Sequence, residues 1–523
     1  MKTLRLRHGL GLGTVALSVA LLQACGGGSS ASSSSNSATA SLAGTVTGFG
    51  SVVVDGVEVE DVYARVAHEN ADGSYTNDVL QMGHRVRVSH DGAHNASQVL
   101  IDAAVIGLVS KVDTSNKTLT VAGQVVTVNA DSALGPVTVY GGGYTDLNSV
   151  VVNDLVQVHG TPVYDSTSKT YKVQATRIQK DAGTQRVQVS GKIANYTSTS
   201  FTLNGLTVNT TSTTAVRPSG STLANDVQVT AYGGTLSGSV LTATNIRVDR
   251  NQSSANTTMQ AQLGGTVSNY NASAGTFEVQ GTTVKIGTAT VQPTGKSVQD
   301  KAYVRVQGTL ASDGTITATQ IQVRTSDTTA DLAKVLLIGT ISDYVEPSSF
   351  VVRGVPVDAS DAALVKSSNC PSTFSGYTKT VKVQATQQTD TAVVMATRID
   401  CDPSSTTKLI KPYEGKVASV NSTAKTFSLT LSSGSTQTVQ WNDTTTFNGL
   451  TAATLQDQTV HVDGYTDSTT NTFVARVVSL DSDSDSAPVR DDKKFRVRQN
   501  GGTTDSTSTA QSNWTQYRNR KQR

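Results

Sequence analysis

The chain has 523 residues, of which 37% are hydrophobic and 16% are charged, and its formal net charge is +2. Its 44 Gly and 10 Pro are too few for a collagen-like chain or for disorder driven by these two residues. Basic residues gather at the two ends, which leaves the body of the chain with a net charge of −7. This charge excludes a strongly basic nucleic-acid-binding body, so no nucleic-acid partner is expected. The length predicts several domains.

Residues 1–24 have the layout of a secretory signal peptide. Three basic side chains within the first seven residues precede an apolar run over residues 9–22, which is too short to span a membrane as a helix. The run is followed by Leu-Gln-Ala-Cys, which resembles a bacterial lipobox, whose cysteine becomes the first mature residue and carries lipid. We therefore predict that Cys25 is lipidated and that the membrane is a partner through this lipid. An ordinary cleaved signal with an incidental cysteine is the alternative.

The regions that flank the body are predicted to be unstructured. Residues 25–42 carry three Gly after the cysteine and then 8 Ser among residues 29–41, which is typical of a flexible tether. Gly26, at a position where Asp is associated with inner-membrane retention, favours the outer membrane of the cell envelope. Residues 481–523 are polar and basic at their end, and predict a disordered basic tail.

Two cysteines remain if Cys25 carries lipid. An even pair in an oxidising compartment favours a disulfide, so we predict that Cys370 and Cys401 are bonded. Closing a loop of about 30 residues contributes on the order of 3–4 kcal/mol in the chain-entropy model. Two cysteines are too few for a zinc site made of four cysteines.

Self-comparison shows a unit that recurs six times along the body. Each unit opens with Gly followed two residues later by Val or Ile, and then continues into an alternating hairpin with Gly at its turn. The segment Phe201–Val208, with Asn204-Gly205 at its centre, shows the alternation and turn residues that are typical of a hairpin. The opening pairs are Gly44/Val46, Gly107/Val109, Gly191/Ile193, Gly265/Val267, Gly339/Ile341 and Gly415/Val417.

A second pattern closes each unit. It is Val-x-Val with a polar middle residue, followed further on by Ala-x-x-Ile or Ala-x-x-Val. Alternation along a strand predicts that the two valines point inward and that the middle residue faces solvent. The Val-x-Val sequences begin at Val86, Val156, Val227, Val304, Val381 and Val460.

These patterns predict an all-β chain of six tandem small five-stranded OB-like β-barrels. A sheet of five strands has exposed edges unless it closes, and an immunoglobulin-like sandwich usually needs about seven strands and about 100 residues. Repeats of a β-sandwich are the alternative. Short polar linkers predict that the units follow one another like beads on a string. The expected units are residues 43–103, 104–181, 186–250, 260–326, 333–402 and 411–480.

The signal, the Cys-Gly-Gly-Gly start, the opening Gly44–Val52 and the tandem units together resemble bacterial envelope proteins of the domain-of-unknown-function 5666 family. The resemblance covers about residues 43–480. It implies a location in the cell envelope and a fold of tandem β units. Its motifs are structural β patterns, so it supplies no catalytic residue.

Catalytic chemistry has little support in the sequence. No Gly-x-Ser-x-Gly elbow, His-Glu-x-x-His helix, phosphate loop or Cys-x-x-Cys occurs, so neither an enzyme nor a cofactor is expected. His84, His90 and His94 could bind Zn²⁺ or Cu²⁺ if they converged. Separate strand-end and turn histidines are the favoured interpretation, and no metal site is expected.

Three tyrosines recur at the fifth position after the opening glycine. Tyr196, Tyr270 and Tyr344 would point outward under strict alternation, where their rings could stack on the sugars of an envelope polysaccharide. A β-bulge that turns each ring inward is the favoured alternative.

The function expected from these observations is that of a lipid-anchored cell-envelope protein of tandem barrels, acting as a non-catalytic binding or structural spacer module. A polysaccharide-binding or adhesion protein of the cell surface is the alternative within binding, and the partner would be an envelope polysaccharide or a protein. An envelope enzyme is the alternative of another class, and it is disfavoured because repeated units do not assemble one unique acid/base constellation.

Overall fold

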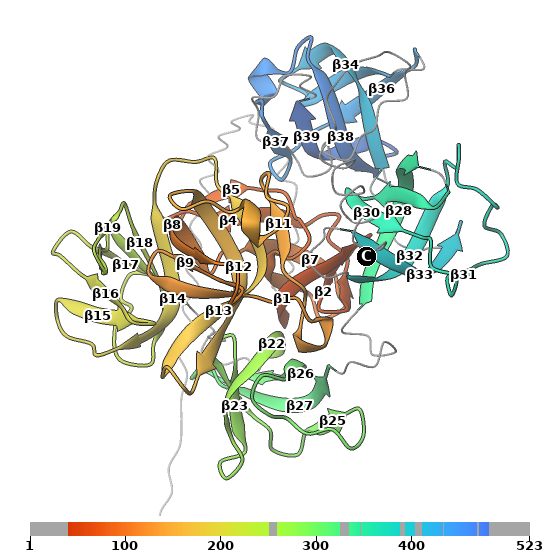
Figure 1. The fold of residues 1–523 in the computed structure, drawn as a ribbon. Helices are drawn as coiled ribbons and strands as arrows, with labels where there is room; N and C mark the ends of the chain where they lie inside the picture. The colour runs from red at the N-terminus through yellow and green to blue at the C-terminus, as the bar shows by residue number, and fades with distance from the viewer. Residues whose placement is uncertain are drawn as a thin grey trace, which may run out of the picture. The chain divides into compact units, whose positions relative to one another are not determined.

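The computed structural model describes residues 40–249, 259–324, 334–345, 347–387, 393–402, 411–431, 434–467 and 470–480. The signal peptide, Cys25, the tether up to residue 39 and the basic tail lie outside these ranges. Residues 40–42, which were predicted to end the tether, instead begin the strand Ala40–Phe49. Regular structure within them consists of strands and of short 3₁₀ turns at Ser132–Leu134, Leu147–Ser149 and Ala452–Thr454 (Figure 1). In this part of the chain, no helix has the length and apolar character needed to cross a membrane.

The strands are grouped below into segments named by order in the chain. The first segment has β1 (Ala40–Phe49), β2 (Val52–Val54), β3 (Val57–Val59), β4 (Arg65–Glu69), β5 (Tyr75–Asn77), β6 (Arg85–His90) and β7 (Ala96–Ile101). The second has β8 (Val105–Asp113), β9 (Thr118–Val121), β10 (Gln124–Val128), β11 (Val139–Gly141), β12 (Leu155–Asp165) and β13 (Thr170–Lys180). The third has β14 (Val187–Ala194), β15 (Ser200–Leu203), β16 (Leu206–Asn209), β17 (Ala215–Arg217), β18 (Gln228–Gly233), β19 (Leu236–Ser237), β20 (Val240–Thr242) and β21 (Asn245–Val248).

The remaining segments follow the same plan. The fourth has β22 (Met259–Asn271), β23 (Thr276–Val279), β24 (Thr282–Lys285), β25 (Thr290–Gln292), β26 (Tyr303–Leu310) and β27 (Ile316–Val323). The fifth has β28 (Lys334–Val345), β29 (Ser349–Val352), β30 (Val355–Asp358), β31 (Val365–Lys366), β32 (Thr380–Gln387) and β33 (Val394–Cys401). The sixth has β34 (Lys411–Asn421), β35 (Thr426–Leu431), β36 (Thr436–Gln440), β37 (Thr446–Asn448), β38 (Thr459–Thr466) and β39 (Phe473–Leu480).

The fourth segment shows how each small barrel closes. Its opening strand β22 pairs with β23, which forms a hairpin with β24, and β24 lies parallel to the last strand β27. The Val-x-Val strand β26 then pairs with both β27 and β22, which completes the ring of five strands. The short strand β25 adds alongside β27. The prediction of an all-β chain of small five-stranded barrels in repeated units is thereby confirmed.

The opening glycine of several units lies against the hairpin turn, which explains it sterically. A Cβ at Gly107 would lie 2.7 Å from the Cβ of Ala122, the residue before Gly123 at the hairpin turn. Gly191 stands in the same relation to Asn204, and Gly339 to Arg353. Because the hairpin tip folds back over the opening strand, a side chain at the opening position would displace it. The glycine at these opening positions therefore reflects a close approach between the opening strand and the hairpin turn.

A bulge recurs where the Val-x-Val strand pairs with the last strand. The register shifts between Gln307 and Gly308 in β26, and a Cβ at Gly308 would clash with the carbonyl oxygen of Thr317. The same shift falls next to Gly160 in β12 and Gly464 in β38. Bulges bend and twist a strand, which helps a sheet of five strands to close on itself.

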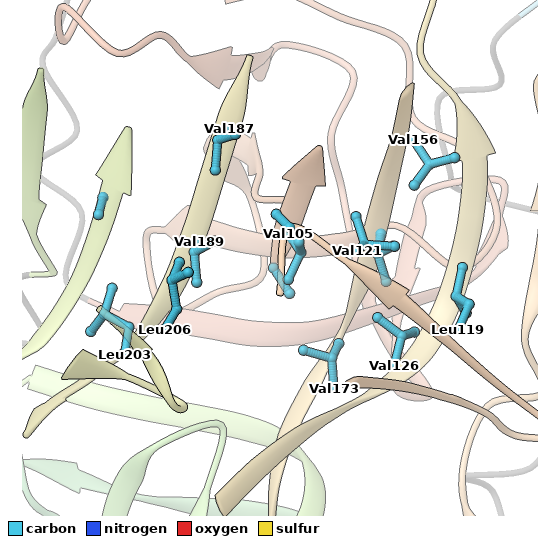
Figure 2. Close-up of a cluster of buried hydrophobic side chains, with 14 of the residues drawn as sticks. Val105, Leu119, Val121, Val126, Val156, Val173, Val187, Val189, Leu203 and Leu206 are labelled. Carbon is cyan, nitrogen blue, oxygen red and sulfur yellow. The ribbon is translucent and has the colours of Figure 1, made fainter. Parts of the chain in front are cut away.

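The valines of the Val-x-Val motifs point into the barrels as predicted. Val156 and Val158 are fully buried, and the corresponding valines are buried in the other segments except Val227, which is partly buried. The second and third segments share one continuous apolar cluster, part of which Figure 2 shows, with labelled side chains from both segments, such as Val105 of β8 and Val189 of β14. The cores of the other segments form separate clusters.

The expectation of beads on a string is wrong for the described residues. Residues Ala40–Ala43 of β1 pair in parallel with β22, and Gly48 and Phe49 pair in parallel with β28. As a result, strands of the first, fourth and fifth segments belong to one 19-stranded sheet, and those of the second and third to a 14-stranded sheet. The linkers are short, but the first segment also presents backbone edges on which later segments pair.

Candidate functional site

Buried polar side chains gather where the first segment meets the others, and these contacts are the candidate sites. Three clusters stand out, and we name them after their central residues. The histidine cluster lies between the first and second segments around His84 and His159. The Asp102 cluster joins the first and third segments, and the Asp55 cluster joins the first and fourth.

In the histidine cluster, two imidazoles stack across the contact. The rings of His84, just before β6, and His159, in β12, lie 4.5 Å apart between centroids with their planes 36° apart. They are 3% and 0% exposed. Burial lowers the pKa of His159 to about 3, assisted by the charges of Arg177 and Arg85. Burial also holds the pKa of His84 well below 6.5, so both rings are neutral at pH 7.

The other two histidines singled out in the sequence lie elsewhere. His90, at the end of β6, is buried, and its ring meets the exposed His94 edge-on with centroids 5.7 Å apart. His90 Nδ1 accepts a hydrogen bond from the Gly92 N–H. The structure therefore brings His90 and His94 together but places His84 against His159. Within the described ranges, no group of three or more His, Cys, Asp or Glu could hold a metal ion.

In the Asp102 cluster, one carboxylate faces several guanidinium groups. Arg85 Nη2 lies 2.7 Å from Asp102 Oδ2, and Arg247 Nη2 of the third segment lies 3.2 Å from Oδ1. Arg247 also binds Glu69 and Asp249. Burial alone would raise the pKa of Asp102, but the charges of Arg85, Arg247 and Arg87 outweigh it and hold that pKa well below its usual range.

In the Asp55 cluster, a carboxyl group from a hairpin turn is buried against another barrel. Asp55 is 0% exposed, accepts a 3.1 Å hydrogen bond from the Thr45 N–H and accepts a 2.7 Å bond from the Tyr303 hydroxyl. Arg305 donates to the Asp55 carbonyl oxygen, and the Arg324 guanidinium lies over the Tyr303 ring. Burial raises the pKa of Asp55 to about 6, although these hydrogen bonds and charges oppose the rise.

The contact with Asp55 corrects one expectation of the alternation rule. Arg305 is the middle residue of a Val-x-Val motif and was expected to face solvent, yet it is only partly exposed and its guanidinium donates to the first segment. The middle residue Arg87 likewise places its Nη1 3.9 Å from Oδ1 of Asp249, which follows β21 of the third segment. These side chains do point out of their own barrels, but a neighbouring barrel covers that face.

The three tyrosines occupy equivalent but differently exposed places. Each follows a residue with positive φ, namely Asn195, Asn269 and Asp343, and in β22 and β28 the register shifts at this point. Tyr196 is 39% exposed. Tyr270 and Tyr344 are half-buried and pack against the apolar clusters of their own barrels.

A disulfide joins Cys370 to Cys401, as predicted. Cys401 ends β33 and is buried, while Cys370 packs at the edge of the same apolar cluster. The bond ties the loop after β31 to the last strand of the fifth segment. The predicted lipidation site, Cys25, lies outside the described residues.

Sequence reasoning missed the partners that make these clusters. In the sequence, Asp55 only precedes the turn glycine Gly56, and no motif includes Asp102 or His159. Asp102 does carry a signal, since it interrupts the apolar run Val99–Val105 at a place where a charge must find a partner. No local pattern indicates that the partner is Arg247, which is 145 residues further along the chain.

Comparison with known proteins agrees with the internal repeats. No curated protein matches the chain. One matching solved structure, the Drosophila Unr fragment CSD456, is 14% identical over 43% of this chain and 98% of its own, but its TM-score of 0.13 does not establish a common fold. The family model described as domain of unknown function (DUF5666) matches five times, at residues 106–179, 190–247, 264–322, 338–400 and 414–479. With tandem matches over more than half of its length, the chain belongs to the DUF5666 family.

Proposed function

We propose that this chain is a lipid-anchored protein of the bacterial cell envelope, held in the outer membrane by Cys25, whose tandem barrels act as a non-catalytic binding or structural spacer module. The anchor rests on the signal-like residues 1–24 and the Leu-Gln-Ala-Cys sequence that they end in. The proposed role as a binding or structural spacer module rests on the repeated barrels.

One observation carries the non-catalytic interpretation. In each of the three clusters, a buried ionisable group faces another barrel of the same chain: His84 meets His159, Asp102 meets Arg247, and Asp55 meets Tyr303. In an enzyme, groups with strongly shifted pKa values usually line a cleft that admits substrate. Here their partners are side chains of the neighbouring segment, so their shifts follow from domain packing.

We further propose that the first segment is a sixth copy of the repeated unit and that the units are OB-like. The family model matches begin at residue 106, but β1 pairs with β2, β2 with β3, and β6 with both β1 and β7, as in the other units. In the fourth segment the third and fifth barrel strands are parallel, which supports the Greek-key order of an OB-like barrel over a sandwich.

Membrane fractionation of cells that express the full chain tests the anchor. Cys25→Ala should release the protein from the membrane fraction, because the residue that would carry the lipid is gone. Gly26→Asp is the matched control, since it keeps the cysteine and should move the protein from the outer to the inner membrane. Unchanged membrane retention of Cys25→Ala would contradict the proposal.

A polysaccharide-binding function is the second candidate, and the exposed ring of Tyr196 favours it. Screening the purified protein against a glycan array would distinguish a polysaccharide-binding function from that of a structural spacer. Binding that is lost in Tyr196→Ala and kept in Tyr270→Phe would support sugar recognition, whereas an array without binding would favour the spacer.

A further inference from the structure

The histidine cluster closes the contact between the first and second segments. The loop that carries His84 lies directly on β13, where the Thr176 hydroxyl donates a 2.7 Å hydrogen bond to the Gly83 carbonyl oxygen. A Cβ at Gly83 would clash with the carbonyl oxygen of Thr176, so the two backbones meet without side chains between them. Arg177 of β13 donates to the carbonyl oxygen of Met82 in the same loop. The two imidazoles are buried beside this contact.

The charges that face these two rings are mainly positive. Arg177 of β13 acts on both rings, and Arg85 of β6 acts on His159. Asp102 is the carboxylate that faces His159, but it is already bound by Arg85 and Arg247. The charge of His68 in β4, whose imidazole pairs with Asp78, also acts on His84. A proton added to either imidazole would therefore be buried beside a guanidinium, without a carboxylate of its own.

We propose that the contact between the first and second segments is an acid-sensitive latch, which opens when His84 and His159 become protonated. Protonation would bring two like charges to 4.5 Å between ring centroids, inside a contact that excludes water. Opening the contact hydrates both rings, separates His84 from His159 and from Arg177, and separates His159 from Arg85. The latch goes beyond the proposed function, because it does not depend on the lipid anchor or on a ligand.

The direction of the pH response follows from linkage. The folded pKa of His159 is about 3 and the free value is 6.5, so the contribution of the closed contact is complete above pH 6.5 and is lost as the pH falls toward 3. Between pH 6.5 and 4.5, His159 alone should increase the open population about 50-fold. The Asp55 cluster responds in the opposite direction, since acid protonates a carboxyl group whose pKa is raised.

Hydroxyl-radical footprinting of the full chain, read by mass spectrometry at pH 7.5 and 4.5, tests the latch. Oxidation of His84 and His159 should rise strongly at pH 4.5, relative to the exposed Tyr75. Tyr303, buried in the Asp55 cluster, should remain protected at both pH values and so reports that the barrels stay folded.

Variants without the two imidazoles distinguish protonation of His84 and His159 from general unfolding of the protein by acid. Replacing both rings, as His84→Phe with His159→Phe, should leave positions 84 and 159 protected from oxidation at pH 4.5, because neither phenyl ring takes a proton. His94→Gln is the matched control, since it removes an exposed histidine outside the contact and should keep the acid response. If positions 84 and 159 of the Phe pair are already exposed at pH 7.5, the single variants His84→Phe and His159→Phe replace it, and each should show a smaller rise than the wild-type protein. The proposal fails if the wild-type protein shows no rise, or if acid exposes positions 84 and 159 equally in a closed variant without these histidines.

Discussion

At the scale of single residues, Asp102 and Asp55 are both buried carboxyl groups, but their pKa values move in opposite directions. Arg85, Arg247 and Arg87 surround Asp102 and lower its pKa, whereas burial dominates at Asp55 and raises its pKa. Burial by itself therefore does not decide the charge state. The number of positive groups at hydrogen-bonding distance decides it.

Asp102→Asn should strongly destabilise the contact between the first and third segments. The change leaves Arg85 and Arg247 buried with less negative charge, and breaking one partner of a buried pair costs about 3–5 kcal/mol. Hydrogen exchange read over β7 and β21 should show faster opening of these strands. Asp400→Asn, at the surface pair with Arg398, is the control and should leave exchange unchanged. Equal exchange in the two variants would contradict a structural role for Asp102.

Asp55 should make the contact between the first and fourth segments less stable as the pH rises. Its folded pKa of about 6 lies above the free value of 3.8, so its contribution is complete below pH 3.8 and is lost as the pH rises through 6. The total is on the order of 3 kcal/mol. Asp55→Asn, which resembles the protonated carboxyl group, should abolish this slope when local hydrogen exchange in β1 is measured from pH 4 to 7. If the pH dependence of exchange in β1 persists in Asp55→Asn, a group other than Asp55 causes it.

At the scale of strands, the bulge at Gly308 should be required for closure of the fourth barrel. Gly308→Ala places a methyl group against the Thr317 carbonyl oxygen and should cost about 1–3 kcal/mol, as overpacking does. Hydrogen exchange in β26 and β27 measures the effect. Gly234→Ala is the control, because a Cβ at Gly234 meets no atom within 4 Å. Normal protection in Gly308→Ala would show that the strand relaxes around the methyl group.

The disulfide acts on the fifth barrel alone. Its cysteines are separated by 31 residues, and releasing a loop of this length removes about 3–4 kcal/mol in the chain-entropy model. Replacing both cysteines by serine should lower protection of β32 and β33 in hydrogen exchange. Protection of β26 and β27, in a barrel without cysteine, should not change.

Most of each barrel could be predicted from the sequence, because local patterns determine it. The alternation around Asn204-Gly205 specifies a hairpin, and the pair Val156 and Val158 specifies an inward face. The contacts between barrels could not be predicted in this way. Arg305 and Lys382 occupy the same position of the Val-x-Val motif, but Arg305 donates to the carbonyl of Asp55. Which barrel covers which face depends on pairings between distant segments, such as β1 with β22.

At the scale of the whole molecule, the first segment organises the others through strand β1. Gly48 allows the close parallel pairing of β1 with β28, since a Cβ there would clash with the Leu336 carbonyl oxygen. Gly48→Ala should separate the fifth segment from the first, which small-angle X-ray scattering would detect as a larger radius of gyration. Leu336→Ala keeps the backbone pairing and should leave the radius unchanged. A Gly48→Ala protein of unaltered radius would show that other contacts hold the segment.

The position of β1 also determines how the molecule would carry a mechanical load. Residues Ala40–Thr45 are hydrogen-bonded to β6, Ala40–Ala43 also pair with β22, and the far end of the same strand pairs with β28. Tension applied to the chain before Ala40 runs along this strand, and ladder hydrogen bonds lie across the strand direction, so they are loaded together in shear. We therefore expect a high rupture force for pulling from this end, shared among three barrels, whereas pulling on β39 engages the sixth barrel first.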